Sequence, residues 1–178
     1  MFPWSRWGKK SERFSKRLNF VEEIKSKILR WSIVGMEVKF YENAEDSLLK
    51  FAVIVSKANG RWVFCKHKER NTYEVPGGHR EDGETISETA KRELREETGA
   101  VDFDIQPICV YSVIGKNRVN ESGEESYGML YYAEIRKFTG ELHSEMERII
   151  ISDEMPEKWT YPLIQPFLIE ECHRRIQK

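Results

Sequence analysis

The chain has 178 residues, of which 39% are hydrophobic, and a formal net charge of −1. These values fit one globular domain with a sizeable core and exclude a largely disordered chain. No apolar run approaches the roughly 18 residues of a membrane span, so no transmembrane helix is expected. Residues 1–30 hold nine Lys/Arg and three Glu, which leaves the remaining chain acidic. Because nucleic-acid binding needs a basic footprint, we expect a small-molecule substrate and no nucleic acid.

Residues 1–35 are predicted to form a basic, aromatic extension with one short amphipathic helix. Asn19 and Glu22 have the spacing of a capping box. Apolar residues then recur at helical intervals, namely Phe20, Ile24, Ile28 and Trp31. This apolar face favours packing on the domain or in a homodimer, whereas the basic residues leave RNA or an anionic surface as alternatives.

The cysteines and the N-terminus indicate the cellular compartment. Cys65, Cys109 and Cys172 are far apart and form no Cys-x-x-Cys pair, which is typical of reduced, buried thiols. The N-terminus lacks the apolar core of a secretory signal. We therefore expect a cytoplasmic protein.

Residues 36–178 are predicted to form the main domain, in which strands surround one central helix. The predicted strands are 49–55, 61–66, 73–75, 105–113, 127–135 and 148–151. Asn59-Gly60 indicates a tight hairpin, and Pro76-Gly77-Gly78 is expected to end the third strand. This order predicts an α+β fold with a mixed sheet.

Two helices complete the predicted domain. The pattern of residues 85–98 is helical, with Ile86, Ala90 and Leu94 spaced by four and Gly99 placed as the C-terminal cap. A final helix is expected to begin near Pro162, because proline suits the first helical turn.

Glutamates crowd the end of the central helix. Glu93, Glu96 and Glu97 fall within an arc of about 100°. Like charges so spaced cost about 0.2–0.5 kcal/mol per pair, and the helix dipole disfavours anions in the last turns. A divalent cation would remove both penalties, and carboxylates are ligands that Mg²⁺ accepts. Taken alone, a Glu-rich helix is more simply a solvated surface. The residues around it decide between a solvated surface and a metal site.

That pattern covers residues 78–100 and consists of Gly78, Glu84, Arg92-Glu93-Leu94, Glu96-Glu97 and Gly99-Ala100. It resembles the Nudix box, Gly-x5-Glu-x7-Arg-Glu-U-x-Glu-Glu-x-Gly-U, where U is apolar. All nine specified positions match, although Ala100 is small for its apolar position. At about 6% usage per residue type, a chance match is below about one in ten million. The chain therefore looks like a MutT-like Nudix hydrolase.

The resemblance implies a fold, a cofactor and residue roles. The family fold is an α/β/α sandwich with a mixed sheet between helices. Its members hydrolyse phosphoanhydrides with one to three Mg²⁺ ions, or sometimes Mn²⁺. By position, the metal ligands would be Gly77 through its carbonyl, Glu93, Glu96 and Glu97. Glu84 would support the loop and Arg92 would orient the glutamates, while Glu93 is also a candidate to accept the proton of the attacking water.

Residues outside the box are candidates for the remaining roles. Relatives can take the proton acceptor from elsewhere, which makes Glu134 and Glu147 candidates, although each could be a plain surface glutamate. The basic run Lys66, His67, Lys68 and Arg70 could contact a phosphate, with Lys66 at the position relatives often use. A solvated charge run is the alternative. Tyr73 and Gly78 are candidates for binding the substrate.

The box identifies the reaction and not the substrate. Residues 155–162 and the strand that ends in Glu134 look like bacterial members grouped with the 8-oxo-dGTP diphosphatases, which release a nucleoside monophosphate and pyrophosphate. ADP-ribose, or another nucleoside diphosphate linked to a second group, is the alternative substrate. A catalytically inert nucleotide-binding or interaction module is an alternative of another class, which the intact box glutamates disfavour.

Overall fold

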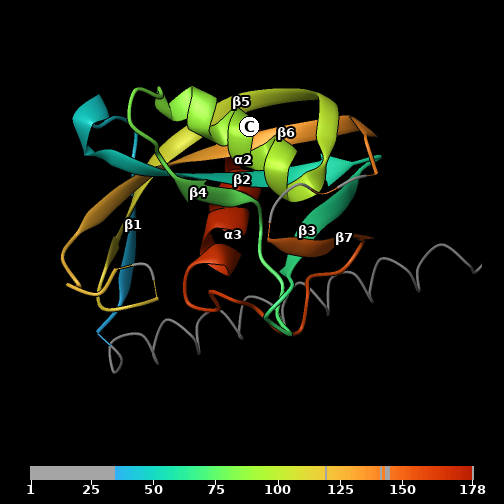
Figure 1. Ribbon diagram of the computed structural model, residues 1–178. Helices are drawn as coiled ribbons and strands as arrows, with labels where there is room; N and C mark the ends of the chain where they lie inside the picture. The colour runs from blue at the N-terminus through green and yellow to red at the C-terminus, as the bar shows by residue number, and fades with distance from the viewer. Residues whose placement is uncertain (1–34, 119, 141, 143–144, 178) are drawn as a thin grey trace, which may run out of the picture.

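The computed structural model describes residues 35–177 except 119, 141, 143 and 144, and this part of the chain forms a mixed sheet with a helix on each face (Figure 1). The elements in chain order are β1 (Glu37–Tyr41), the 3-10 helix η1 (Asp46–Leu48), β2 (Leu49–Ala58), β3 (Arg61–His67), β4 (Gly77–His79), α2 (Ile86–Thr98), β5 (Ala100–Ile114), β6 (Ser126–Phe138), β7 (Met146–Ser152) and α3 (Gln165–Ile176). This arrangement confirms the α+β fold expected from the sequence. Neither of these two helices is long and apolar enough to cross a membrane. The extension helix predicted for residues 19–31 lies outside the described residues.

Strand β2 is the centre of the sheet, whose order is β1-β5-β6-β2-β3-β7. It pairs in parallel with β6, whereas the other pairings are antiparallel. The opposite edge of β2 is shared, because its residues 56–58 pair with β3 and its residues 51–53 pair with β4. Strands β3 and β4 therefore diverge. The chain between them, residues 68–76, lines part of a cavity beside β4.

The core consists of two layers, one on each face of the sheet. Ile54 belongs to the layer under α2, and its neighbour Val55 belongs to the layer under α3. Burial on both faces follows from the apolar run predicted for this strand. The hairpin that leads to β3 is also confirmed, since Asn59 and Gly60 have φ values of 52° and 77°. All three cysteines are free and buried, as expected.

Helix α2 begins and ends at the predicted residues. Thr85 and Glu88 form a capping box at its start, and Gly99 ends it in the left-handed conformation with φ 71°. Ile86, Ala90 and Leu94 are buried against the sheet. Both ends of the helix are thus fixed, which sets the direction in which the glutamates of its last turns point.

Three sequence predictions about local structure are wrong. Residues 73–75 form no strand, because Tyr73 and Glu74 make isolated bridges only. Extended structure does not end at Pro76-Gly77-Gly78, because Gly77–His79 forms β4 on the edge of β2. Glycine permits this pairing, since a Cβ on Gly77 would lie 2.5 Å from the carbonyl oxygen of Ala52. The last helix begins at Gln165 and not near Pro162, and Pro166 occupies its first turn.

Candidate active site

Two carboxylates one helical turn apart on α2 lie against the consecutive glycines of β4. Glu97 Oε2 accepts a hydrogen bond of 2.9 Å from the backbone N–H of Gly77. A Cβ on Gly78 would lie 2.1 Å from Glu93 Oε1, so the Glu93 carboxyl group fills the space that any side chain at position 78 would need. The glycines therefore allow β4 to lie between β2 and the acidic end of α2.

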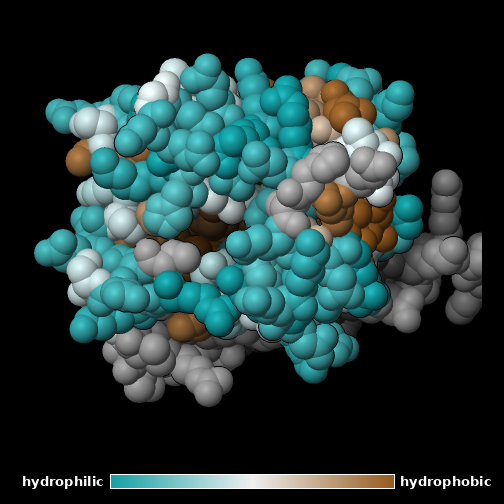
Figure 2. Space-filling view, in the orientation of Figure 1, coloured by the Kyte–Doolittle hydropathy of each residue, from teal (hydrophilic) through white to brown (hydrophobic). Residues whose placement is uncertain are grey.

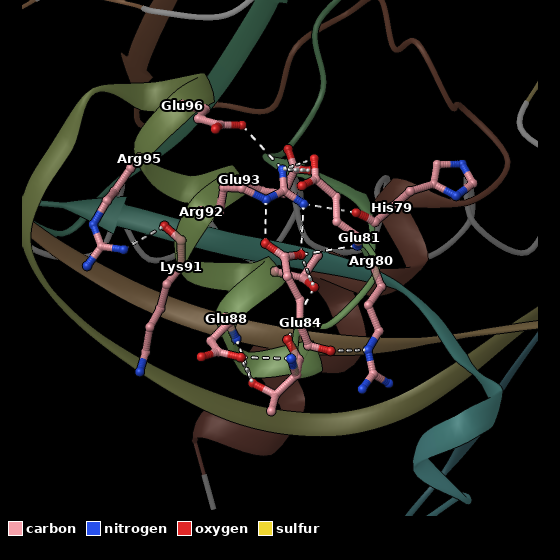
Figure 3. A network of polar contacts seen from close by, with 12 residues as sticks. His79, Arg80, Glu81, Glu84, Glu88, Lys91, Arg92, Glu93, Arg95 and Glu96 are labelled. Carbon is pink, nitrogen blue, oxygen red and sulfur yellow. Dashed lines mark hydrogen bonds and ion pairs between the residues drawn. The ribbon is translucent and has the colours of Figure 1, made fainter.

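Arg92 connects the loop before α2 to two of the glutamates (Figure 3). Its Nε donates to Glu84 Oε1 at 2.7 Å, and its Nη1 donates to Glu93 Oε1 at 2.8 Å and to Glu96 Oε2 at 3.3 Å. Its Nη2 donates to the carbonyl of His79 at 3.0 Å. The hydrogen bond from Arg92 lowers the pKa of Glu84 to about 2. One guanidinium thus fixes the loop and orients the carboxylates, as the predicted roles of Glu84 and Arg92 require.

The surroundings of Glu97 favour a bound cation. Burial raises the pKa of Glu97 well above its ordinary value, and the charges of Glu93, Glu74 and Glu96 raise it further, against a smaller opposing effect of the Gly77 N–H. Within the described residues, no Lys, Arg or His forms an ion pair with Glu97. A cation placed here would stabilise the ionised carboxylate.

The donor set fits Mg²⁺ bound together with other ligands. Among the described residues, no three Asp, Glu, His or Cys side chains are grouped closely enough to hold a metal by themselves. Glu96 is exposed and directed to Arg92, while Glu93 and Glu97 lie on the glycines. Mg²⁺ commonly takes one or two carboxylates and completes its shell with water and substrate phosphates. Glu93 and Glu97 meet that requirement without a third carboxylate.

A cavity of about 240 Å³ opens beside β4. Its apolar wall comes from the sheet and α3 and includes Val53, Val75, Tyr111, Val113, Ile164 and Leu168. Its polar lining includes His67, Arg70, Glu74, Glu97, Asn117 and Glu145. Figure 2 shows a central hollow with a hydrophobic floor surrounded by hydrophilic residues. An apolar wall beside a carboxylate pair suits a ligand with a flat ring at one end and phosphates at the other.

The structure does not bring Lys66 or Tyr73 to this cavity. Lys66 forms an ion pair with Glu147 on the neighbouring strand β7, and neither residue lines the cavity. The hydroxyl of Tyr73 accepts a hydrogen bond of 3.2 Å from Arg148, also on β7. Both side chains contact β7 because the end of β3 no longer pairs with β2 and pairs with β7 alone.

Glu134 also lies away from the box glutamates. It pairs in register with Lys57, four residues along β2 from Val53, the partner of Gly77. At about 3.3 Å per residue this separation is roughly 13 Å. Its Oε2 accepts a hydrogen bond of 2.7 Å from Tyr132. The structure thus does not bring Glu134 together with the box glutamates, and its role as a proton acceptor stays a prediction.

Sequence reasoning missed a carboxylate that does reach the cavity. Glu145 Oε2 lies 2.7 Å from His67 Nε2. The backbone N–H of Glu69 donates to His67 Nδ1 at 3.1 Å, so Nδ1 is the acceptor and Nε2 carries the proton that Glu145 accepts. The sequence offered no indication of this contact, because residues 67 and 145 meet only through the pairing of β3 with β7.

Comparison with known proteins identifies the family. The model of the NUDIX domain matches residues 47–159, which is more than half of the chain. The chain belongs to the Nudix family. The sequence prediction of the Nudix family is thus confirmed.

Individual relatives are more distant. The Bacillus subtilis (strain 168) protein YtkD, provisionally named an 8-oxo-dGTP diphosphatase, is 31% identical over 109 residues, which cover 61% of this chain and 65% of YtkD. The chain thus matches just under two thirds of the length of that Nudix relative. The crystal structure of a mutant of the Bacillus subtilis pyrophosphohydrolase BsRppH shares the fold, with 23% identity, a TM-score of 0.63, and coverage of 78% of this chain and 90% of that chain. The Shewanella oneidensis NrtR NUDIX domain, solved with ADP ribose, has 17% identity, a TM-score of 0.54, and coverage of 72% of this chain and 88% of that domain.

Proposed function

We propose that this Nudix hydrolase cleaves the anhydride between the α- and β-phosphates of a nucleoside triphosphate, with 8-oxo-dGTP as the preferred substrate. The products are a nucleoside monophosphate and pyrophosphate. The observation that carries the proposal is the placement of two carboxylates, Glu93 and Glu97, on Gly78 and Gly77 at the border of a cavity with an apolar wall. The name of the Bacillus subtilis relative supports the choice of 8-oxo-dGTP.

The metal in this proposal is Mg²⁺, with Mn²⁺ as a substitute, and its protein ligands are Glu93, Glu97 and the carbonyl of Gly77. When bound, it supplies neutralisation of the phosphate oxygens and activation of the attacking water. Glu96 is directed to Arg92 and exposed, so we assign it a supporting position at the edge of the site.

The protein residues then have separate tasks. The Gly77 N–H holds one oxygen of Glu97, which fixes the orientation of its carboxylate. Arg92 holds Glu93 Oε1, which leaves Glu93 Oε2 to accept the proton of the water that attacks phosphorus. The apolar wall packs on the base and excludes water from its faces, while Arg92 and Glu84 keep the loop rigid. Catalysis in this scheme depends on positioning and charge, as is usual for phosphoryl transfer.

A substrate panel tests the proposal. Purified protein with Mg²⁺ is given 8-oxo-dGTP, dGTP, ADP-ribose and a nucleotide sugar, and products are separated by ion-exchange chromatography. We expect pyrophosphate and 8-oxo-dGMP, with kcat/KM at least about tenfold above that for ADP-ribose, because differences in fit to an apolar pocket discriminate by about 10- to 200-fold. A preference for ADP-ribose would contradict the substrate. No hydrolysis of any compound with either metal would contradict catalysis and favour an inert binding module.

A further inference from the structure

Among the described residues that line the cavity, Arg70 is the one Lys or Arg side chain. The same lining contains the carboxylates of Glu74, Glu97 and Glu145. A nucleoside triphosphate carries several negative charges, so it would enter a lining in which carboxylates outnumber cations. A positively charged side chain would therefore favour binding of the triphosphate even with Mg²⁺ bound, and Arg70 is in position to supply that charge.

Arg70 is held by a carboxylate that is itself fixed. Its Nη1 lies 3.3 Å from Glu74 Oε2, and the exposed fraction of the side chain is 26% for Arg70 and 7% for Glu74. The backbone of Glu74 is bonded twice to Cys65 of β3, by N–H···O contacts of 2.8 and 3.0 Å. Tyr161, another residue of the cavity lining, also makes a side-chain hydrogen bond with Arg70. A guanidinium has five N–H groups, so these two contacts leave donors for a further acceptor. A guanidinium held in place by a carboxylate and a hydroxyl, with donors left over, is suited to a phosphate.

The anchor is close to the catalytic carboxylates. Glu74 precedes Gly77 by three residues, which span at most about 10 Å. The charge of Glu74 also contributes to the raised pKa of Glu97, so the two carboxylates interact. Arg70 and Glu97 thus face one cavity, where a phosphate chain bound at Gly77 lies within reach of the guanidinium.

Lys66 does not offer this contact, although it comes from the same basic run. Its side chain is 11% exposed and its ammonium is paired with Glu147, outside the cavity lining. His67 lines the cavity, but its ring nitrogens already contact Glu69 and Glu145. Among the described lining residues, Arg70 is thus the side chain that carries a permanent positive charge.

We infer that Arg70 binds the polyphosphate of the substrate, that Glu74 is the positioning residue that holds it, and that Lys66 has no part in binding. This inference rests on the proposed function, since it assumes a nucleoside triphosphate in the cavity. Arg70, the last residue of the basic run, then contributes to the site, because the chain turns directly after β3, with the Arg70 N–H bonded to the His67 carbonyl, and this turn brings Arg70 to Glu74.

Binding of a non-hydrolysable probe tests this assignment without turnover. α,β-Methylene-dGTP and deoxyguanosine are titrated by calorimetry into wild type, R70Q, R70K and the matched control K66Q, each with Mg²⁺. We expect R70Q to bind the triphosphate analogue about ten- to a hundredfold more weakly, because a charge-assisted contact is lost, and to bind deoxyguanosine as wild type does. R70K should recover part of the affinity, and K66Q should match wild type. Equal analogue affinity in R70Q and wild type, or an equal loss for both ligands, would overturn the inference.

Removing Arg70 leaves Glu74 buried without its ion-pair partner, which could lower the stability of the protein. A second pair of variants separates this effect from the loss of binding. E74Q keeps the cation but removes its anchor, and R70Q/E74Q removes both charges. E74Q should raise KM for 8-oxo-dGTP with little change in kcat, and addition of R70Q to E74Q should weaken analogue binding by less than R70Q does in wild type. A fall in kcat alone for E74Q, or full additivity of the two changes, would contradict the positioning role. If wild type binds no triphosphate analogue, the proposed function fails, which is a different result from equal binding by wild type and R70Q.

Discussion

The two sides of the cavity are built in different ways. On the α2 side, the contacts that matter join residues close in sequence, such as Gly77 and Glu97, which are 20 residues apart. On the opposite side, contacts join segments far apart, with His67 and Glu145 separated by 78 residues and Val75 and Gln165 by 90. The difference indicates that the metal-binding carboxylates proposed for this Nudix protein lie in one local stretch of the sequence, whereas the substrate selection that we propose depends on the packing of the whole domain.

The largest expected effect on activity comes from a change on the α2 side of the cavity. Glu97→Gln keeps the shape of the side chain and its contact with the Gly77 N–H but removes the charge that would hold a cation. We expect kcat to fall by at least about a hundredfold, as when a preorganised electrostatic group is lost. The free energy of unfolding should not decrease, because burial already disfavours the ionised form of Glu97. Steady-state kinetics and thermal unfolding measure the two quantities.

Glu134→Gln is the matched control for that variant. It makes the same chemical change on β6, roughly 13 Å along the sheet from the level of Gly77. Its activity should be within about twofold of wild type, since catalysis responds steeply only to groups positioned at the reacting atoms. Comparable losses in both variants would show that the metal does not lie at the Gly77 end of the sheet.

Gly78→Ala should have the next largest effect. The added Cβ would lie 2.1 Å from Glu93 Oε1, which forces the carboxylate or β4 to move. We expect kcat/KM to fall by about ten- to a hundredfold, since a shift of about 1 Å at a reacting centre has effects of this order. Retention of full activity would mean that Glu93 need not lie on Gly78.

Gly60→Ala provides the contrast for the glycine change. Gly60 has φ 77° and open space around its Cβ position, so alanine there strains the hairpin and touches nothing else. The variant should lose about 1 kcal/mol of unfolding free energy and keep its activity. Chemical denaturation and initial rates on both glycine variants would thus separate damage to the site from damage to the fold.

What could be predicted from the sequence follows the same division. Helix α2, its C-terminal cap and the glutamates on it were predictable, because capping residues and periodicity act within a few residues of one another. The placement of Lys66, Tyr73 and Glu134 was not, since each depends on which strand lies beside which. Strand β4 was missed because glycines, which usually end strands, are required here by the close approach of β2. The basic run after β3 did indicate a phosphate contact, but only the turn of the chain distinguishes Arg70 from Lys66.

The smallest expected effect concerns the loop before α2 and depends on pH. Arg92 lowers the pKa of Glu84 from 4.5 to about 2, so this carboxylate stabilises the fold above pH 4.5 and loses that contribution as pH falls toward 2. Glu84→Gln should therefore cost about 1 kcal/mol or less at pH 7, given that the ion pair is partly exposed. Urea unfolding of both proteins should show the difference shrinking by pH 3. A difference that is constant from pH 7 to pH 3 would contradict the ionic origin.

The claim that Glu93 and Glu97 hold a divalent cation is tested most directly by metal binding. Mn²⁺ can be titrated into wild type and Glu97→Gln, each with α,β-methylene-dGTP, and free Mn²⁺ followed by electron paramagnetic resonance. We expect Mn²⁺ uptake by wild type and at least about tenfold weaker uptake by the variant, because an anionic ligand is lost. Equal uptake by both proteins, or none by wild type, would contradict it.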